Sequence, residues 1–244
     1  MYFFIEKSIS GYLYMQIHNI FPLTVCFDTL KISENERKKL IDNIKNLHKK
    51  SEPKHNPHSA WTGDVHGSEF LFNDLKFNNL TSLIALKIYE YLDLLSINTK
   101  MLDLYLQRSW ATITNTNQNI KFHTHSQSHI SFAYYLLKPA DTGGIVFKSD
   151  DPQNEICKNI FVKDKVEKNL LTKTTAYNAN EAYIDLKQDS IVIFPSKTRH
   201  STSPNKSNKI RISLSGDIVL MLKKSDGVEH LMPNFKHWKK LNKN

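Results

Sequence analysis

Two histidines separated by one residue stand near the middle of the chain, and imidazoles at this spacing are suited to bind a metal ion. In an extended strand His123 and His125 point to the same face and can reach one ion. His200 is a third candidate, much later in the chain. Between these positions lie an apolar, β-rich run from Ile130 to Leu137, a turn, and a short strand from Ile145 to Phe147. Such strands return the chain to the histidines, so we expect a small β-barrel to bring the three imidazoles together.

The order of these features resembles the iron(II) and 2-oxoglutarate-dependent oxygenases, specifically their prolyl-hydroxylase-like branch. That family has a metal-ligand pair, a strand ending near Tyr-Leu, a Gly-Gly turn, an aromatic residue, a strand ending in Phe-Pro, a distal histidine and then a basic residue. In this chain the features are His123-Thr124-His125, Tyr135-Leu136, Gly143-Gly144, Phe147, Phe194-Pro195, His200 and Arg211. The resemblance covers roughly Leu104 to Leu220, about half of the chain.

The resemblance implies a mainly β fold with flanking helices, the double-stranded β-helix or jelly-roll barrel. It implies a non-haem dioxygenase that uses Fe(II), 2-oxoglutarate and dioxygen to hydroxylate a C–H bond, with release of succinate and carbon dioxide. It further implies that His123, His125 and His200 hold the iron. Arg211 and Ser213 would bind the distal carboxylate of 2-oxoglutarate, for which a planar guanidinium fork is suited because it forms two parallel hydrogen bonds.

One position departs from the family's pattern. The family has Asp or Glu where this chain has His125, as in the usual facial triad of two histidines and one carboxylate. The site is therefore either a three-histidine site or one whose carboxylate comes from elsewhere, for which Asp150 and Asp151 are candidates. Three histidines are also a ligand set of catalytic zinc, so the alternatives are a zinc-type hydrolase and a noncatalytic binding barrel. The position of Arg211 after the distal histidine favours the oxygenase.

The composition is that of an ordinary globular protein with an excess of lysine. Of 244 residues, 40% are hydrophobic and 23% charged, and 33 basic residues against 24 acidic ones give a net charge of +9. We expect one domain over residues 1–244, with the barrel core at about 101–222 and helical support at about 17–100. Because no basic run is interleaved with stacking aromatics, a nucleic acid partner is not expected. We expect a small molecule or a peptidyl side chain as the substrate.

Cysteine usage and the first residues bear on the compartment. Cys26 and Cys157 are far apart and neither belongs to a C-x-x-C pair, so we expect neither a disulfide framework nor a cysteine zinc site, and a reducing cytoplasm. Glu6 and Lys7 interrupt the apolar opening well short of a membrane span, and no signal peptide is expected. Met15 is an alternative start.

Periodicity predicts two helices and several strands. A helix is expected from Ser33 to Lys50, because Ser33 and Glu36 form a capping-box pattern, and a second from Asn79 to Leu95, with Asn78 and Asn79 as capping candidates. The predicted strands are Ile17 to Phe27 at a sheet edge, Met101 to Ile113, Ala182 to Leu186, Ser190 to Phe194, and Ile210 to Leu214, on which Arg211 and Ser213 share a face.

Two long polar segments are predicted to be loops. The segment from Ser51 to Ser68 is rich in Pro, His and Gly; we expect surface roles for its histidines (His55, His58 and His66) and a place near the substrate mouth for Trp61. The segment from Lys148 to Tyr183 is expected to lie over the barrel mouth and to determine substrate specificity. We expect His200 in a loop and His129 as a hydrogen-bonded wall residue rather than a ligand.

Overall fold

The computed structural model describes residues 19–51, 58–225, 227 and 231–241, and within them two β-sheets make up most of the regular structure. The larger sheet has the strand order β1-β7-β4-β9-β3-β2, with β10 beside β9, and the smaller has the order β6-β5-β8. Strands of the larger sheet are β1 (Cys26–Thr29), β2 (Trp61–Thr62), β3 (Leu102–Thr114), β4 (Ile130–Leu137), β7 (Ser190–Pro195), β9 (Arg211–Leu222) and β10 (Met232–Pro233). Those of the smaller sheet are β5 (Ile145–Lys148), β6 (Glu181–Ile184) and β8 (Arg199–Thr202).

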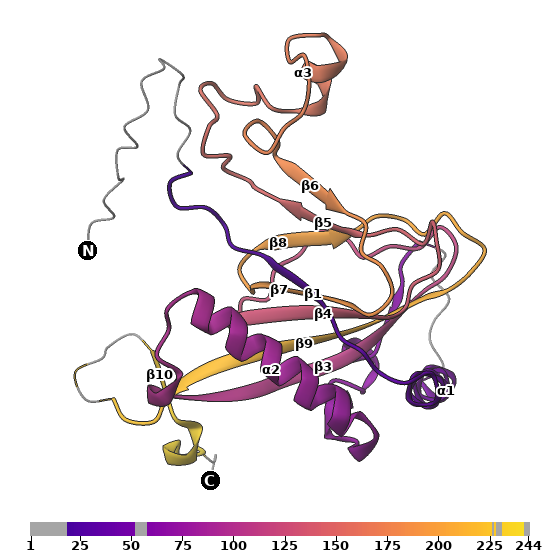
Figure 1. The fold of residues 1–244 in the computed structure, drawn as a ribbon, viewed down its shortest axis with the longest axis vertical. Helices are drawn as coiled ribbons and strands as arrows, with labels where there is room; N and C mark the ends of the chain where they lie inside the picture. Colours follow the sequence, from indigo (N-terminus) through magenta and orange to yellow (C-terminus); the bar gives the residue numbers. More distant parts are fainter. Residues whose placement is uncertain (1–18, 52–57, 226, 228–230, 242–244) are drawn as a thin grey trace.

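The sheets form the expected jelly-roll, the double-stranded β-helix. Figure 1 shows the smaller sheet above the larger one, with helices α1 (Glu34–Lys50) and α2 (Asn78–Leu94) on the opposite side of the larger sheet. The helices share a buried core with the face of β4 that carries Phe132, Tyr134 and Leu136. The opposite face of β4 points between the sheets, where Tyr135 packs with Ile145, Phe147, Val192 and Phe194. Alternation along one strand therefore separates the helical support from the space that holds the site.

Both predicted helices are present. The predicted N-cap residue is confirmed for α1 and wrong for α2. The Ser33 side chain accepts a hydrogen bond from Glu36 N at 3.2 Å, as a capping box requires. The expectation that Asn78 or Asn79 caps α2 was wrong, because the helix follows a 3-10 turn and its N-cap position is Phe77. The Asn79 amide instead donates to both carboxylate oxygens of Glu36, at 3.1 and 2.9 Å, which ties α2 to α1.

Arg37 joins α1 to the sheet through a buried ion pair. Its Nη1 and Nη2 donate to the carboxylate of Asp189 at 2.6 and 2.9 Å, and Nη1 also donates to Leu136 O at 3.1 Å. The hydroxyl of Tyr134 donates to the same carboxylate at 2.6 Å. Asp189 has a left-handed backbone (φ 69°) in the turn before β7. One carboxylate thus fixes helix, strand and turn relative to one another.

Several boundaries differ from the sequence prediction. The edge strand β1 begins at Cys26, later than expected, and residues 17 and 18 lie outside the described residues. His200 was expected in a loop but lies in β8, which pairs with β5. Residues 58–68 were expected to be loop, yet they contain β2 and the 3-10 turn η1 (Asp64–His66), because backbone hydrogen bonds hold this segment against β3. His55 and the opening that contains Met15 lie outside the described residues.

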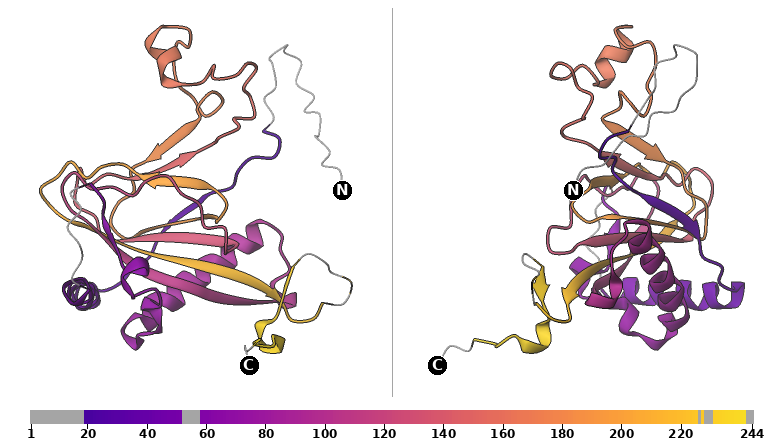
Figure 2. Two further views of the ribbon diagram at one scale, coloured as in Figure 1. Left: turned by 180° about the vertical axis from the view of Figure 1, so that it is seen from behind. Right: turned by 60° about the vertical axis from the view of Figure 1, so that its left-hand side comes forward.

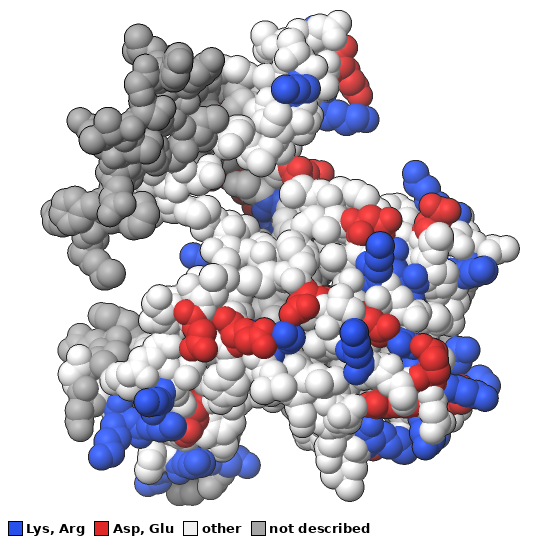
Figure 3. All heavy atoms as spheres, viewed as in Figure 1, with Lys and Arg blue, Asp and Glu red and all other residues white. Residues whose placement is uncertain are grey.

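The insertion between β5 and β6 projects from the molecule. Figure 2 shows it, with α3 (Lys163–Glu167), at the end of the molecule farthest from the larger sheet. Lysine and arginine side chains alternate with acidic ones over the face shown in Figure 3, in agreement with a scattered basic excess. Among the described residues, no helix combines the length and apolar character that a membrane crossing demands.

Candidate metal centre

Backbone pairing brings the two ends of the predicted site together. His123 and His200 form an antiparallel bridge in which each N–H donates to the other's carbonyl, at 2.9 and 3.0 Å. Two residues further on, His125 N donates to Ser196 O at 3.0 Å. The segment that carries His123 and His125 is therefore fixed to the strand-turn region that leads into β8.

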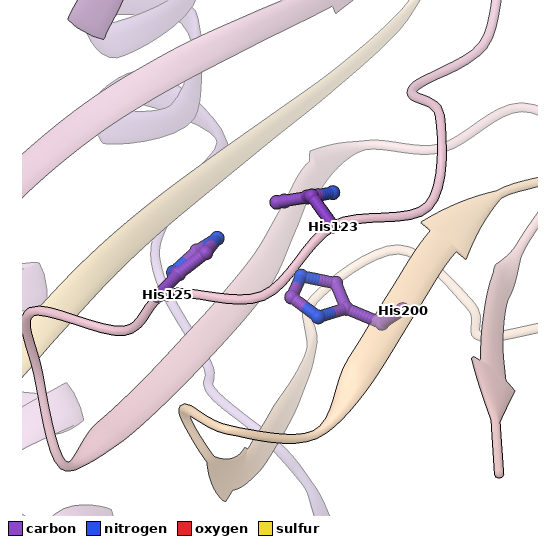
Figure 4. Close-up of side chains that lie close together, drawn as sticks. All are labelled: His123, His125 and His200. Atoms are coloured by element: carbon purple, nitrogen blue, oxygen red, sulfur yellow. The ribbon is translucent and has the colours of Figure 1, made fainter. Parts of the chain in front are cut away.

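The three imidazoles converge on one point, as Figure 4 shows. One ring nitrogen from each of His123, His125 and His200 lies within 4.8 Å of the others, which is the span of ligands to a single ion. The ring centroids of His123 and His200 are 4.3 Å apart, and that of His125 is 5.0 Å from the first and 5.1 Å from the second. Among the described residues, these three are the group of His, Cys, Asp and Glu side chains close enough together to hold a metal ion.

All three rings have an oxygen acceptor at Nδ1. His123 Nδ1 lies 2.9 Å from Lys121 O, and His200 Nδ1 lies 2.9 Å from Thr198 O. His125 Nδ1 lies 2.5 Å from Asp217 Oδ1. An acceptor at Nδ1 favours the tautomer with the proton there and leaves Nε2 as a lone pair for a metal. The donor set thus fits a first-row ion that binds imidazole.

Burial favours the neutral form of His123 and His200. It lowers the pKa of His123, against an opposing effect of the Lys121 carbonyl, and it lowers the pKa of His200 to about 3, helped by the neighbouring His123. An unprotonated ring is the form that coordinates metal. Phe194 packs edge-on against His200 at 4.7 Å and Trp110 lies 5.6 Å from His125, so aromatic side chains hold the ring planes.

Asp217 is a fully buried carboxylate behind His125. Besides His125, its oxygens accept from Ser131 Oγ at 2.8 Å, from Arg108 Nη2 at 2.8 Å and from Gln127 Nε2 at 3.2 Å. Burial alone would raise the pKa of Asp217, but the hydrogen bonds from His125, Arg108 and Ser131 outweigh it and hold the pKa below its usual value. A carboxylate of this kind orients the imidazole and raises its basicity as a ligand.

Other candidate ligands lie elsewhere. Asp150 is exposed and pairs with Arg199 at 2.7 Å, and Asp151 is exposed; neither belongs to the histidine group. His129 Nδ1 accepts from Leu220 N at 2.9 Å, as a wall residue would. His66 Nδ1 contacts Thr62 O at 2.7 Å.

A cavity of about 1170 Å³ opens beside the histidines. Its wall includes Trp61 and Asp64 from the segment before α2, Gln107 and Arg108 from β3, and Tyr135 from β4. Trp61 therefore lies in the cavity wall, and its place near the substrate mouth stays a prediction. Among the described residues that line the cavity, none comes from 148–183, so the expectation that this insertion covers the barrel mouth was wrong; residues 59–70 form that wall instead.

The two residues assigned to 2-oxoglutarate lie two positions apart on β9, and only one of them lines the cavity. Ser213 lines the cavity, whereas Arg211 continues the same row of β9 beyond the lining residues. Arg211 is 1% exposed, and it donates to Thr142 O at 2.8 Å and to Thr114 Oγ1 at 3.2 Å. Its Nε has no hydrogen-bond partner among the described residues.

Comparisons with known proteins agree on one class. Residues 108–217 match the family described as "Putative 2OG-Fe(II) oxygenase", a region that contains the three histidines, Arg211 and Asp217. No curated protein matches the chain.

Three solved structures have a similar fold and low sequence identity to this chain. SnoK, a non-heme alpha ketoglutarate-dependent carbocyclase from nogalamycin biosynthesis, is 11% identical with a TM-score of 0.52 over 86% of this chain and 87% of that one. HygX from Streptomyces hygroscopicus, solved with nickel and 2-oxoglutarate, is 8% identical with a TM-score of 0.52 over 87% and 92%. AviO1 from Streptomyces viridochromogenes is 8% identical with a TM-score of 0.53 over 86% and 93%. At these sequence identities, the similarity shows a shared fold.

The family match and the three-histidine cluster, on a jelly-roll, define the class of protein. Residues 108–217, a little under half of the chain, match the 2OG-Fe(II) oxygenases, oxidoreductases that need Fe(II), 2-oxoglutarate and dioxygen, which confirms the resemblance stated from the sequence.

Sequence reasoning missed the residues around the histidines. Asp217 was not singled out because the predicted strand ended at Leu214, whereas β9 runs on to Leu222. Asp217 has the same parity as Ser213, so a longer strand would have placed it on the site's face. Asp64 and Gln107 gave no signal in the sequence, because their relevance comes from the cavity that they line.

Proposed function

We propose that the protein hydroxylates a C–H bond of its substrate, with release of succinate and carbon dioxide. His123, His125 and His200 hold the iron, and Arg211 with Ser213 holds the distal carboxylate of 2-oxoglutarate. The convergence of three imidazoles, each with its Nδ1 next to an oxygen acceptor, at a cavity wall carries this proposal. Asp217 acts through His125 and supplies, one side chain further out, the negative charge that the usual facial triad has at the metal.

The buried charge of Arg211 supports its role. Among the described residues no carboxylate forms an ion pair with Arg211, although its side chain is almost wholly buried. Burial lowers the pKa of Arg211, because an isolated cation is poorly solvated there. An anionic cosubstrate would neutralise this charge. Tyr135 lines the cavity and is electrostatically coupled to Arg211, so it connects the cavity with the guanidinium.

The chain's own residues orient the three imidazoles and cover part of their surface. With iron bound, 2-oxoglutarate and dioxygen supply the oxidising chemistry. Lys121 O, Thr198 O and Asp217 hold the three Nδ1 protons, so that each Nε2 faces the metal position. Phe194 packs against His200 and Trp110 lies beside His125, so an aromatic ring covers one side of each of these imidazoles. The unpartnered Nε of Arg211 is available for a charge-assisted hydrogen bond.

A small molecule or a peptidyl side chain is the proposed substrate. The cavity of about 1170 Å³ exceeds the ~300–1000 Å³ of ordinary small-molecule sites, which leaves room for both 2-oxoglutarate and a substrate. HygX is solved with hygromycin B bound, and SnoN with nogalamycin RO, both at a TM-score of 0.51. These complexes support a small-molecule substrate.

We propose one domain over residues 1–244, because α1 and α2 share their core with β4 and β9. The unpaired thiols of Cys26 and Cys157 support a reducing, cytoplasmic location.

Anaerobic addition of 2-oxoglutarate to the Fe(II) protein tests the proposal. A weak visible charge-transfer band should report the chelate, and succinate should form when dioxygen is admitted. Arg211→Ala should keep iron but weaken 2-oxoglutarate binding about 10- to 150-fold, the value of a charged hydrogen bond of about 1.5 to 3 kcal/mol. Arg211→Lys should restore part of the affinity, because lysine keeps the positive charge but lacks the Nε donor and the planar guanidinium.

Arg199→Ala is the matched control, since Arg199 is exposed and pairs with Asp150. An unchanged affinity for 2-oxoglutarate in Arg211→Ala would contradict the assignment of Arg211, and absence of any chelate band in the parent would contradict the proposed function.

A further inference from the structure

Two hydrogen-bond acceptors in the cavity wall have no donor among the described residues. They are Asp64 Oδ1 and Gln107 Oε1; their residues line the cavity, while the two oxygens themselves are covered by protein atoms, so a side-chain rotation is needed to turn either oxygen towards the cavity. Buried polar atoms in folded proteins are almost always paired, so unpaired ones mark a place where a partner is expected. Because the two side chains line the cavity that also contains the histidines, the partner can come from a bound molecule.

The position of Asp64 is fixed by the backbone on both sides. Before it, Thr62 pairs with Thr112 of β3 and Gly63 N donates to Ala111 O at 2.8 Å. After it, Glu69 O accepts from Ser109 N of β3 at 2.8 Å. The carboxylate is therefore held at the cavity wall by a segment attached to the sheet, and its side chain is only 16% exposed.

Charge determines which kind of donor fits. Arg108 forms an ion pair with Asp64, with Nη1 3.6 Å from Oδ2, which is longer than a hydrogen bond. The same guanidinium donates to Asp217 at 2.8 and 3.3 Å. One cation between two carboxylates leaves an excess negative charge at Asp64. A protonated donor compensates this charge, whereas a neutral donor does not, and a carboxylate buried without compensation is unfavourable.

We propose that Asp64 and Gln107 recognise a cationic N–H group of the substrate, an ammonium or a guanidinium. Asp64 accepts a charge-assisted hydrogen bond and Gln107 Oε1 accepts a second hydrogen bond from the same or an adjacent donor. This inference rests on the proposed function in one respect: the group would belong to the molecule that is oxidised at the histidine cluster. A free amine and a lysine or arginine side chain of a peptide share this chemistry.

Binding of small probes to the purified protein tests the inference. The cationic probes are Nα-acetyl-lysine amide, Nα-acetyl-arginine amide and spermidine, and the controls are Nα-acetyl-norleucine amide and Nα-acetyl-glutamate amide. Calorimetry should give the cationic probes an affinity about tenfold or more above that of the norleucine probe, as expected for a hydrogen bond to a charged group. Stronger binding of spermidine than of the capped amino acids would indicate a free amine, and the reverse order a peptidyl side chain.

Variants identify the acceptors. Asp64→Asn should abolish the preference for cations and leave the affinity for Ni(II) unchanged, and Gln107→Glu should increase the preference. Glu69→Gln is the matched control, because Glu69 belongs to the same segment but does not line the cavity. The inference is overturned if the parent does not distinguish cationic from neutral probes, if Asp64→Asn keeps the preference, or if it loses Ni(II), which would make Asp64 a metal residue.

The probes are titrated with and without iron and 2-oxoglutarate, so that two failures stay separate. A missing chelate band counts against the proposed function alone, because cation binding is then judged in the unloaded protein.

Discussion

At the scale of single residues, the site is determined by the acceptor behind each imidazole. The usual facial triad has a carboxylate at the metal, whereas here the carboxylate of Asp217 lies behind His125, at 2.5 Å from its Nδ1. In the proposed centre the negative charge acts on the His125 imidazole through a hydrogen bond and not as a direct ligand. A histidine at the family's carboxylate position would then still have a buried negative charge one side chain away.

Asp217→Asn should lower metal affinity about 10- to 100-fold, the usual effect of losing a charged partner of a ligating histidine. The amide retains an acceptor for His125 Nδ1, so the ring should stay in place while its basicity falls. Calorimetric titration with Ni(II) or Co(II) measures the change. Asp150→Asn is the control, because Asp150 was the other candidate for a carboxylate at the metal; loss of metal there, with Asp217→Asn unchanged, would reverse the assignment.

The clustering of the three candidate ligands could be predicted from the sequence, and the residues around them could not. His123, His125 and His200 follow from local spacing and from the order of motifs along the chain. Asp64 and Gln107 depend on contacts between segments that pair only in the folded sheet, for which the sequence contains no periodic signal. Arg211 was predicted by position, but its burial outside the cavity lining depends on how β9 packs.

At the scale of elements, the smaller sheet sets the distance between the two ends of the metal centre. β5 pairs with β6 on one side and with β8, which carries His200, on the other. The turn before β5 approaches β6 so closely that a Cβ on Gly144 would lie 2.2 Å from Ile184 O. Backbone atoms leave no room there, so the glycine is required by the close approach of the two strands.

Gly144→Ala should therefore destabilise the protein by about 2 to 3 kcal/mol, because overpacking against backbone forces strands apart. Thermal unfolding should show a Tm roughly 5 to 10 °C lower, and Ni(II) affinity should fall because β8 moves with β5. Gly67→Ala is the control: nothing lies within 4 Å of its Cβ position, so only its left-handed backbone (φ 75°) adds a cost of about 1 kcal/mol. Equal effects of the two substitutions would show that the close approach at Gly144 is relieved cheaply.

Elements with strong periodicity were predictable, and those formed by pairing were not. α1, β3 and β4 lie within a residue or two of their predicted bounds, since their patterns are local. β8 and β2 are short, and they exist because a neighbouring strand supplies hydrogen-bond partners. α2 also lies within one residue of its predicted bounds, but its cap was wrong, because a 3-10 turn precedes the helix and no side chain caps it.

At the scale of the whole molecule, the larger sheet has a core on each face: one packs the helices against the sheet, and the other adjoins the candidate metal centre. The helices and the outer face of β4 form one core, joined to the turn before β7 by Arg37 and Asp189. The space between the sheets contains the other core, together with the histidines and the cavity. Substitutions in the first core should change stability, and those in the second should change metal and cosubstrate binding as well.

Acid should destabilise the metal-free protein through histidines that the fold holds neutral, and His129 allows this effect to be isolated. Burial lowers the pKa of His129, and its Nδ1 must stay unprotonated to accept the hydrogen bond from Leu220 N at 2.9 Å. The folded pKa is thus below the unfolded value of about 6.5. Between the two values the unfolded chain binds more protons, so stability is fully present above about pH 6.5 and falls as the pH drops towards the folded pKa.

His129→Asn should therefore reduce the fall in Tm between pH 7.5 and pH 5, because the Asn oxygen can accept from Leu220 N and does not titrate. Both proteins are measured with chelator, so that His123 and His200, whose pKa values are also lowered, contribute equally to each. His237→Asn is the control, since His237 is exposed near the end of the described chain. If the fall in Tm is as large in His129→Asn as in the parent, protonation of His129 is not what weakens the fold, and the acid sensitivity belongs to the histidine cluster.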